Sequence, residues 1–290
     1  MTPDPILLQI GPITIYWYGF LIMTGVVLAA TVAGKLVADD GEDPDHVWSA
    51  LVWCLIFGVV GARLYHVIHK WDEIYAQNLD QIFGLHMAGF GIYGAVLGGM
   101  VGMYIYTKRN KLSFLQWGDY AFVGVPLAQA LGRWGNFFNQ ELFGFPTDLP
   151  WGIYIDHARR DFQYPQFAQY DGRFHPTFLY ESIWNLLSFG ILWFLSRRYK
   201  KRLLPGDIAC FYGVLYPLGR FFLEYQRAEP DLWRIAGIPT AQLFALAAFV
   251  LCGGILVYRH FIAKQKPLAE ESAELSLATE ESVTDEREGA

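Results

Sequence analysis

The stretch from Gly132 to Gly144, GRWGNFFNQELFG, gathers the side chains best suited to bind an anionic substrate. Arg133 offers a rigid fork of donors that matches a phosphate group. Asn136 and Asn139 can donate hydrogen bonds to ester or glycerol oxygens, and Glu141 can hold one of these donors in place. An Arg–Glu ion pair that only anchors a helix end explains the same residues equally well. Polar clustering alone therefore leaves both interpretations open.

A second polar run, YPLGRFFLEYQR, contains Arg220 and Glu224. The two residues are four positions apart, so on a helix they share one face. A buried ion pair is one interpretation, but taking both charges out of water is seldom justified by helix stability alone. Arg133 is expected just after the fourth apolar segment and Arg220 near the end of the sixth, on the same side of the membrane. Two guanidinium groups at one membrane depth predict a site for an anionic lipid headgroup.

A third run, HPTFLYE, begins at His175 and ends at Glu181. Pro176 suits the first turn of a helix, and Tyr180 suits a membrane interface. His175 can be a catalytic base or a hydrogen-bonded structural histidine, and the sequence leaves these alternatives open.

The elements that must position these residues are long apolar segments. The chain has 290 residues, of which 53% are hydrophobic and 17% charged, and the apolar residues come in blocks of about twenty, the length of a helix that crosses a bilayer. Charged residues inside the fourth and sixth segments make these two weaker. The sequence predicts an all-α polytopic membrane protein with about seven transmembrane helices. The expected spans are Ile13–Gly34, Val47–Ile68, Met87–Tyr106, Leu115–Leu131, Phe178–Leu195, Asp207–Leu223 and Ala241–Phe261.

Short basic loops predict the orientation of these spans. Lys and Arg residues follow the third, fifth and seventh segments, and such loops stay in the cytoplasm. The N-terminus is then outside and the C-terminus cytoplasmic. The long aromatic connection 137–176, between the fourth and fifth spans, falls on the outer side and is expected to form interfacial arms or short helices.

The C-terminal segment is acidic, the N-terminus has no signal-peptide pattern, and the three cysteines lack metal-ligand spacing. Residues 267–290 carry eight acidic side chains and one arginine, which predicts a disordered cytoplasmic tail after a transmembrane catalytic domain over 1–266. The N-terminus lacks the basic residues of a cleavable signal peptide, so the first apolar block should remain as a helix. Cys54, Cys210 and Cys252 have no metal-ligand spacing, and neither a metal nor a cofactor is expected.

Glycines in the third apolar segment follow a helix-packing pattern. Gly94, Gly98 and Gly102 form two overlapping GxxxG steps on one helical face. Small residues at this spacing let two helix backbones approach closely. Close packing against another helix is therefore expected here without any ligand.

The motifs GRxGNFxNxExxG, HPTxLYE and RFxxExxR occur in this order, together with Trp17-Tyr18-Gly19 and Gly61-Ala-Arg63. Because of this ordered set of motifs, the chain resembles the prolipoprotein diacylglyceryl transferase family over nearly its whole length, except for the acidic tail. The resemblance implies a bacterial cytoplasmic-membrane enzyme whose partners are phosphatidylglycerol and the signal peptide of a prolipoprotein, not nucleic acid. It further implies transfer of the diacylglyceryl group to the lipobox cysteine, with release of glycerol 1-phosphate, as the first step of lipoprotein maturation.

The resemblance also implies roles for individual residues. Arg133 and Arg220 match the essential arginines, and Arg133 matches a phosphatidylglycerol ligand. Further positions match residues that are functionally important in the family. These are Tyr18, Asn136, Glu141, Gly144, Tyr216 and Glu224.

The sequence departs from the family pattern at Tyr93, where many members have a histidine that has been proposed as a base. A phenol with an ordinary pKa near 10 is a poor base at neutral pH. Three alternatives follow: Tyr93 positions a substrate, the base lies elsewhere, or the substrate thiol ionises beside nearby cations.

The expected chemistry is attack of a substrate thiolate on the glyceryl carbon bonded to phosphate oxygen, with Arg133 and Arg220 stabilising the leaving phosphate and Glu141 and Glu224 orienting the arginines. Two rival classes are disfavoured. A transporter would place polar groups at mid-depth in paired repeats, and no repeat is visible. A retinal-type receptor would need a lysine in the seventh span, and Ala241–Phe261 contains none.

Overall fold

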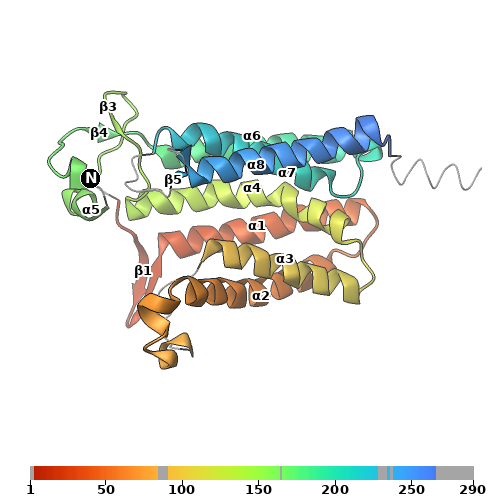
Figure 1. Ribbon diagram of the computed structural model, residues 1–290, viewed down its shortest axis with the longest axis horizontal. Helices are drawn as coiled ribbons and strands as arrows, with labels where there is room; N and C mark the ends of the chain where they lie inside the picture. Colours follow the sequence, from red (N-terminus) through yellow and green to blue (C-terminus); the bar gives the residue numbers. More distant parts are fainter. Residues whose placement is uncertain (1–2, 84–90, 164, 228–233, 236–237, 266–290) are drawn as a thin grey trace, which may run out of the picture. The chain divides into compact units, whose positions relative to one another are not determined.

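Seven helices of 18 or more residues make up most of the described chain (Figure 1). The structure is a computed structural model and describes residues 3–83, 91–163, 165–227, 234–235 and 238–265. The long helices are α1 (Trp17–Asp39), α2 (Asp45–His69), α3 (Ile92–Arg109), α4 (Phe114–Asn139), α6 (Thr177–Arg198), α7 (Asp207–Glu224) and α8 (Thr240–Val257). Each of the seven predicted segments overlaps one of these helices, so the largely helical fold is confirmed, while the number of membrane spans stays a prediction.

Four of the described helices have the length and hydropathy of a membrane span. They are α1, α2, α6 and the segment Gln242–Ile262, which joins most of α8 to the π-helical turn η5 (Tyr258–Ile262). The chain is therefore a polytopic membrane protein. The helices α3, α4 and α7 are not among these four, and α4 and α7 hold the charges that weakened the fourth and sixth predicted spans.

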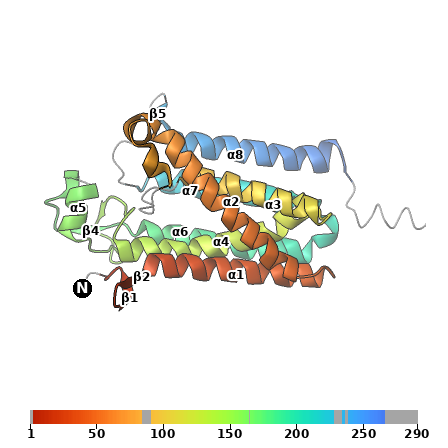
Figure 2. The same cartoon turned by 90° about the horizontal axis from the view of Figure 1, so that it is seen from below.

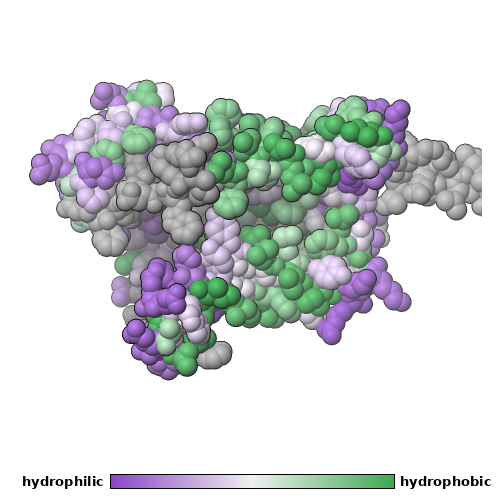
Figure 3. Space-filling view, in the orientation of Figure 1, coloured by the Kyte–Doolittle hydropathy of each residue, from purple (hydrophilic) through white to green (hydrophobic). Residues whose placement is uncertain are grey.

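The distribution of side chains is inverted relative to a water-soluble domain. Leucine, isoleucine, valine and phenylalanine are exposed along α1, α2, α6 and α8, whereas Asn136, Glu181, Asn185 and Glu224 are buried. Apolar residues cover the visible middle of α8 and of the α2–α3 pair, and hydrophilic residues gather at helix ends (Figure 3). An apolar exterior with a polar interior is expected where the surroundings are lipid.

The described chain forms two compact units, and the boundaries between them fall inside α1 and α4. The first unit comprises residues 1–29 and 122–290, and the second comprises residues 30–121. The functional residues discussed below lie in the first unit, except for Arg63 and Tyr93.

In the second unit, α2 and α3 pack at very short range through glycines. A Cβ atom on Gly102 would lie 2.6 Å from the carbonyl oxygen of Trp53, and one on Gly98 or Gly94 would meet the carbonyl oxygen of Phe57 or Gly61 even more closely. The GxxxG face of α3 therefore lies directly against the α2 backbone, as the sequence predicted. After α2 follow the π-helical turn η1 (Trp71–Tyr75) and the 3-10 turn η2 (Leu79–Phe83).

In the first unit, α4 and α6 run side by side in both views (Figure 1, Figure 2). The Ser182 hydroxyl donates to the carbonyl of Ala130, and this bond links the two helices. Gly219 lets α7 approach α6, because a Cβ there would overlap the indole of Trp184. The start of α1 packs on α4 through Gly25, where a Cβ atom would lie 3.0 Å from the backbone of Ala128.

The first predicted span begins later than expected. Residues 13–16 belong to a β-hairpin of β1 (Ile6–Ile10) and β2 (Ile13–Tyr16), and α1 starts only at Trp17. Gly11 has a φ of +57° at the first position of the two-residue turn. Proline cannot adopt a positive φ, so Gly11-Pro12 fits a type II′ turn, which suits a hairpin. The all-α prediction did not include this hairpin or the other short two-stranded sheets of the described chain.

The connection between α4 and α6 is a small folded segment rather than an open loop. It contains β3 (Pro146–Thr147), α5 (His157–Gln163), the 3-10 turn η3 (Pro165–Phe167) and β4 (Arg173–Phe174), which pairs with β3. Phe143, Ile155 and Phe174 form its core. The predicted short helix is confirmed, and the aromatic residues that suggested an interfacial segment build this core.

The remaining described elements lie near the ends of α7 and α8. The 3-10 turn η4 (Lys200–Arg202) connects α6 to α7, and the hairpin β5 (Arg234–Ile235) and β6 (Ile238–Pro239) precedes α8. The predicted acidic tail, 267–290, lies outside the described residues. The predicted single domain over 1–266 stays a prediction.

Candidate active site

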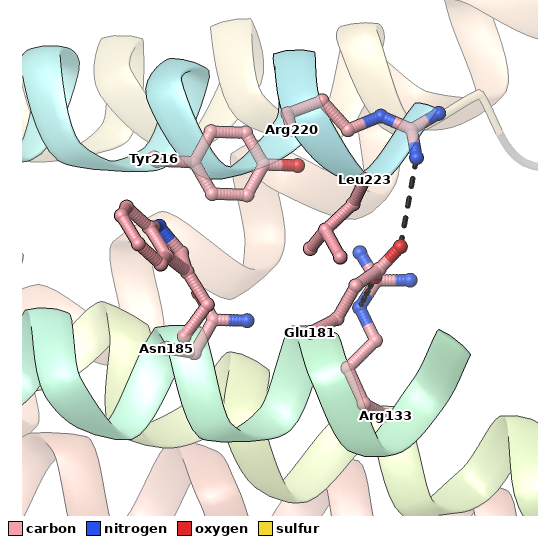
Figure 4. A pocket seen from close by; sticks show the side chains of 7 residues that line it. Arg133, Glu181, Asn185, Tyr216, Arg220 and Leu223 are labelled. Carbon is pink, nitrogen blue, oxygen red and sulfur yellow. Dashed lines mark ion pairs between the residues drawn. The ribbon is translucent and has the colours of Figure 1, made fainter. Parts of the chain in front are cut away.

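The carboxylate of Glu181, in the second turn of α6, gathers arginines from two other segments. Its Oε2 lies 2.6 Å from Nε of Arg133 on α4. Its Oε1 lies 3.5 Å from Nη1 of Arg220 on α7 and 3.7 Å from Nε of Arg227 just beyond α7. Figure 4 shows Arg133 and Arg220 approaching Glu181 from opposite sides. The two arginines predicted to share a site therefore meet at one carboxylate.

Hydrogen bonds within one turn of Glu181 fix the helices that carry this cluster. Next to Glu181, Ser182 donates to α4, and its hydroxyl also accepts a hydrogen bond from Nε1 of Trp134 at 3.3 Å. Trp184 Nε1 donates to the carbonyl of Leu215 on α7 at 2.9 Å. Three helices are thus tied together beside the arginines, which gives the guanidinium groups fixed positions.

The predicted pairing of Arg220 with Glu224 is confirmed. Arg220 Nη2 lies 2.8 Å from Glu224 Oε2, across one turn of α7. The Glu224 side chain is 2% exposed and that of Arg220 is 18% exposed. The cost of desolvating a buried ion pair can exceed the energy of its attraction. Helix stability alone therefore does not explain this pair, which points to a role in positioning or binding.

A small cavity of about 10 Å³ lies between these groups, lined by Arg133, Glu181, Asn185, Tyr216 and Arg220 among others. The charged side chains around it are two guanidinium groups and one carboxylate, so they carry a formal charge of +1. Nη1 of Arg220 is buried and, beyond its 3.5 Å ion pair with Glu181 Oε1, makes no hydrogen bond among the described residues. A buried donor that makes no hydrogen bond, beside a net positive charge, can bind an anion.

The predicted substrate ligands Asn136 and Asn139 both bind Glu141. Their amide nitrogens lie 2.9 and 3.2 Å from Glu141 Oε1. The expectation that Glu141 holds such a donor is confirmed. The expectation that Glu141 orients Arg133 is not met, because the ion pair that the structure gives Arg133 is with Glu181.

The chain reverses sharply at Glu141. The residues on either side, Gln140 and Leu142, have φ angles of +52° and +54°, which are strained for side chains other than glycine. The Gln140 amide compensates by binding Asp156 twice, once at its carboxylate and once at its backbone N–H, each at 2.8 Å. Helix α4 also runs eight residues beyond the predicted end at Leu131, because this turn and not the polar run terminates it.

Tyr18 lies against the end of α4 at Gly135, where a Cβ atom would overlap the tyrosine ring. Tyr18, Asn139 and Glu141 line an open recess of about 650 Å³, together with the β1–β2 hairpin and Arg159. Volumes of this size hold ligands in many proteins. Three other predicted residues, Arg133, Arg220 and Tyr216, line the arginine cavity, where Tyr216 stacks on Tyr212.

Gly144 is required by packing. A Cβ atom at this position would lie 2.5 Å from the carbonyl oxygen of Gln226 and 2.7 Å from Cβ of His175. Its N–H donates to the carbonyl of His175 at 2.9 Å, and Phe145 N–H donates to Gln226. Gly144 thereby holds the segment after α7, which carries Arg227, against the segment before α6.

Comparisons with known proteins agree with these features. A model of the family described as prolipoprotein diacylglyceryl transferase matches residues 5–258. The chain belongs to this family. It is 41% identical over 276 residues to the phosphatidylglycerol–prolipoprotein diacylglyceryl transferase of Chloroflexus aggregans, covering 89% of this chain and 90% of that protein. The proteins of the same name from Gloeobacter violaceus and Acaryochloris marina are 39% and 42% identical, covering 86% and 79% of this chain and 90% and 81% of theirs.

In this member of the prolipoprotein diacylglyceryl transferase family, Tyr93 lies in the second unit. It occupies the first turn of α3, is 59% exposed and has its ring centroid 5.8 Å from that of Tyr65. All the residues that line the arginine cavity belong to the first unit, and Tyr93 is not one of them. Arg63, in the same unit, donates to the carbonyls of Gln81 and Ile82, so it is an internal hydrogen-bonding partner.

His175 has the hydrogen bond of a structural histidine. Its Nδ1 lies 3.0 Å from the hydroxyl of Tyr180, which also accepts a hydrogen bond from Nε1 of Trp151 at 2.9 Å. Across the described part of the chain there is no group of three His, Cys, Asp or Glu side chains that could hold a metal ion.

The carboxylate and the carboxamide that line the arginine cavity were not predicted from the sequence as site residues. Glu181 was noted only within HPTFLYE, and Asn185 was not noted. A signal was available for both, because a carboxylate and a carboxamide four residues apart in an apolar helix share one face. Two predicted membrane arginines also require a partner of opposite charge, and Glu181 is the acidic residue in the only described span between them.

Proposed function

We propose that this chain transfers the diacylglyceryl group of phosphatidylglycerol to the cysteine thiol of a prolipoprotein lipobox. The products are a thioether and glycerol 1-phosphate, and the step begins lipoprotein maturation. The observation that carries the proposal is the meeting of Arg133 and Arg220 at the buried carboxylate of Glu181. The names of the relatives from Chloroflexus aggregans and Gloeobacter violaceus support the same donor and acceptor.

The reaction is a displacement at carbon. The sulfur of the thiolate forms a bond to the terminal glyceryl carbon of the diacylglyceryl group, and the bond from that carbon to phosphate oxygen breaks. The electron pair of the broken bond leaves with the phosphate, which changes from a singly charged diester to a doubly charged monoester. The proton of the thiol is released to water or to this monoester, whose second pKa is about 6.

The arginine cavity suits the charge that develops on the leaving group. Arg133 uses Nε toward Glu181, which leaves its two terminal nitrogens for phosphate oxygens. The buried Nη1 of Arg220 supplies a further donor. Fixed donors in a site with little water stabilise a growing negative charge without reorganisation. Glu181 and Glu224 are positioning residues that hold the two guanidinium groups.

The remaining predicted residues are assigned by their surroundings. Tyr18, Asn139 and Glu141 line the open recess, which we assign to the prolipoprotein segment, with Asn136 holding Glu141 in place. Tyr216 lines the phosphate cavity, and Gly144 acts through packing. Tyr93 is assigned a positioning role, because a phenol is a weak base at neutral pH.

The proposed location is the bacterial cytoplasmic membrane, with seven spans, the N-terminus outside and the C-terminus in the cytoplasm. Within the first unit, α4 and α7 end where α6 begins, and this end carries the arginine cavity. The basic residues Arg197, Arg198 and Lys200–Arg202 lie at the other end of α6. Basic residues favour the cytoplasmic side, which supports a position of the cavity toward the outer leaflet.

Purified protein in detergent, incubated with phosphatidylglycerol and a lipobox peptide, tests the function by mass spectrometry. We expect a mass gain equal to one diacylglyceryl group on the cysteine, and a much slower gain in Arg133→Ala. Arg197→Ala, at the opposite end of the first unit, removes the same charge and should retain transfer. An unmodified peptide beside an active reference transferase would contradict the proposal.

A further inference from the structure

Asn185 is a buried carboxamide whose oxygen is unpaired. It lies on α6 four residues after Glu181, is 3% exposed, and its Oδ1 has no hydrogen-bond partner among the described residues. A buried acceptor left without a partner is unfavourable, and proteins rarely retain one without a use. A ligand that donates a hydrogen bond would satisfy it.

The amide faces the arginine cavity. Asn185 and Tyr216 line the cavity together with Arg133 and Arg220, and Figure 4 shows them on facing helices beside the guanidinium groups. One turn of α6 separates Asn185 from Glu181. A phosphate bound by the arginines would therefore have this carboxamide beside it, deeper along α6.

The cavity selects what can occupy that position. A hydroxyl can donate a hydrogen bond to Oδ1 of Asn185, whereas a trimethylammonium group has no N–H or O–H to donate. A primary ammonium could also donate to the amide oxygen, but the charged side chains lining the cavity have a formal charge of +1 and repel it. An alkyl group would leave Oδ1 unpaired.

We propose that Asn185 is a specificity-determining residue whose Oδ1 accepts a hydrogen bond from a hydroxyl of the glycerol headgroup. This inference rests on the proposed function, since it assumes that a phosphatidylglycerol phosphate binds Arg133 and Arg220. The site then distinguishes phosphatidylglycerol from phospholipids with the same charge and no headgroup hydroxyl.

The test compares two lipid donors with identical acyl chains: phosphatidylglycerol and phosphatidylpropanol, whose three-carbon headgroup has no hydroxyl. Wild-type protein should transfer from phosphatidylglycerol about tenfold faster, the effect of one buried hydrogen bond. In Asn185→Leu, transfer from phosphatidylglycerol should fall about tenfold while transfer from phosphatidylpropanol stays within about twofold, so that the preference disappears. Ser188→Ala, which removes a buried hydroxyl bonded to the carbonyl of Trp184 on the same helix, should keep the preference.

Each result decides the proposal. Equal rates from both lipids in the wild type overturn it without reference to any variant, which covers the case that Asn185→Leu fails to fold. A folded Asn185→Leu variant that slows both donors equally shows a structural amide and also overturns it. Transfer from neither lipid by the wild type refutes the proposed function itself, and this inference with it.

Discussion

Replacing Glu181 with glutamine should strongly lower kcat/KM for transfer while leaving the shape of the site nearly unchanged. The glutamate side chain is 7% exposed and has three guanidinium groups within 3.7 Å. Removing one partner of a buried ion pair typically costs about 3–5 kcal/mol. We expect the lower limit, because glutamine keeps one oxygen acceptor and Arg220 keeps its 2.8 Å pair with Glu224.

If the misplaced guanidinium groups weaken binding of the transition state by the same amount of about 3 kcal/mol, kcat/KM falls about a hundredfold. The assay measures initial rates of transfer to a lipobox peptide over a range of phosphatidylglycerol concentrations, with thermal unfolding measured in parallel. Glu73→Gln is the matched control. Its carboxylate also pairs with a cation, Lys70 at 2.6 Å, but is 65% exposed, so its rate should stay within about twofold of wild type.

The double variant Glu181→Gln/Arg133→Ala sharpens the test. If Glu181 acts by positioning Arg133, the double variant should be no slower than Arg133→Ala alone, because coupled residues are not additive. A Glu181→Gln protein with wild-type kinetics would refute the reasoning, as would losses that simply add in the double variant.

Three other predictions concern packing, the nucleophile and Tyr93. Gly144→Ala should lower the unfolding temperature and the rate of transfer, since its methyl group would meet Gln226. The control Gly190→Ala, which has open space around it, should change neither quantity. Equal behaviour of the two variants would contradict the packing role of Gly144. Replacing Cys54, Cys210 and Cys252 with serine together should leave the rate of transfer within a few-fold of wild type, because the nucleophile belongs to the substrate. Complete loss of transfer would contradict that mechanism. Tyr93→Phe should slow transfer less than about tenfold with an unchanged pH profile, whereas a thousandfold loss would assign the phenol to proton transfer.

The long helices could be predicted from the sequence because lipid imposes a simple rule on them. Apolar blocks of about twenty residues, such as those within α2 and α6, must form helices to satisfy their backbone groups. The GxxxG face of α3 was equally predictable, because glycine spacing alone dictates close packing. The first helix was misplaced by four residues, since Ile13–Tyr16 is as apolar as the helix that follows and only the Gly11-Pro12 turn marks a hairpin.

Which residues belong to the site could be predicted better than which of them pair with one another. Arg133, Arg220 and Glu224 follow from charges placed in apolar segments, and the Arg220–Glu224 pair follows from their i, i+4 spacing. Glu181 could not be assigned to Arg133 in the same way, because the two lie on different helices 48 residues apart. Glu141, close in sequence to Arg133, was the natural partner to expect, yet the strained turn at Gln140 and Leu142 directs it to the asparagines.

The central claim is that Arg133 and Arg220 hold one phosphate between them. A structure of the protein with bound phosphatidylglycerol tests it most directly. We expect phosphate oxygens within about 2.7–2.9 Å of guanidinium nitrogens from both arginines, with Glu181 still bridging the pair. A lipid phosphate bound elsewhere, or contacted by only one of the two arginines, would contradict the account.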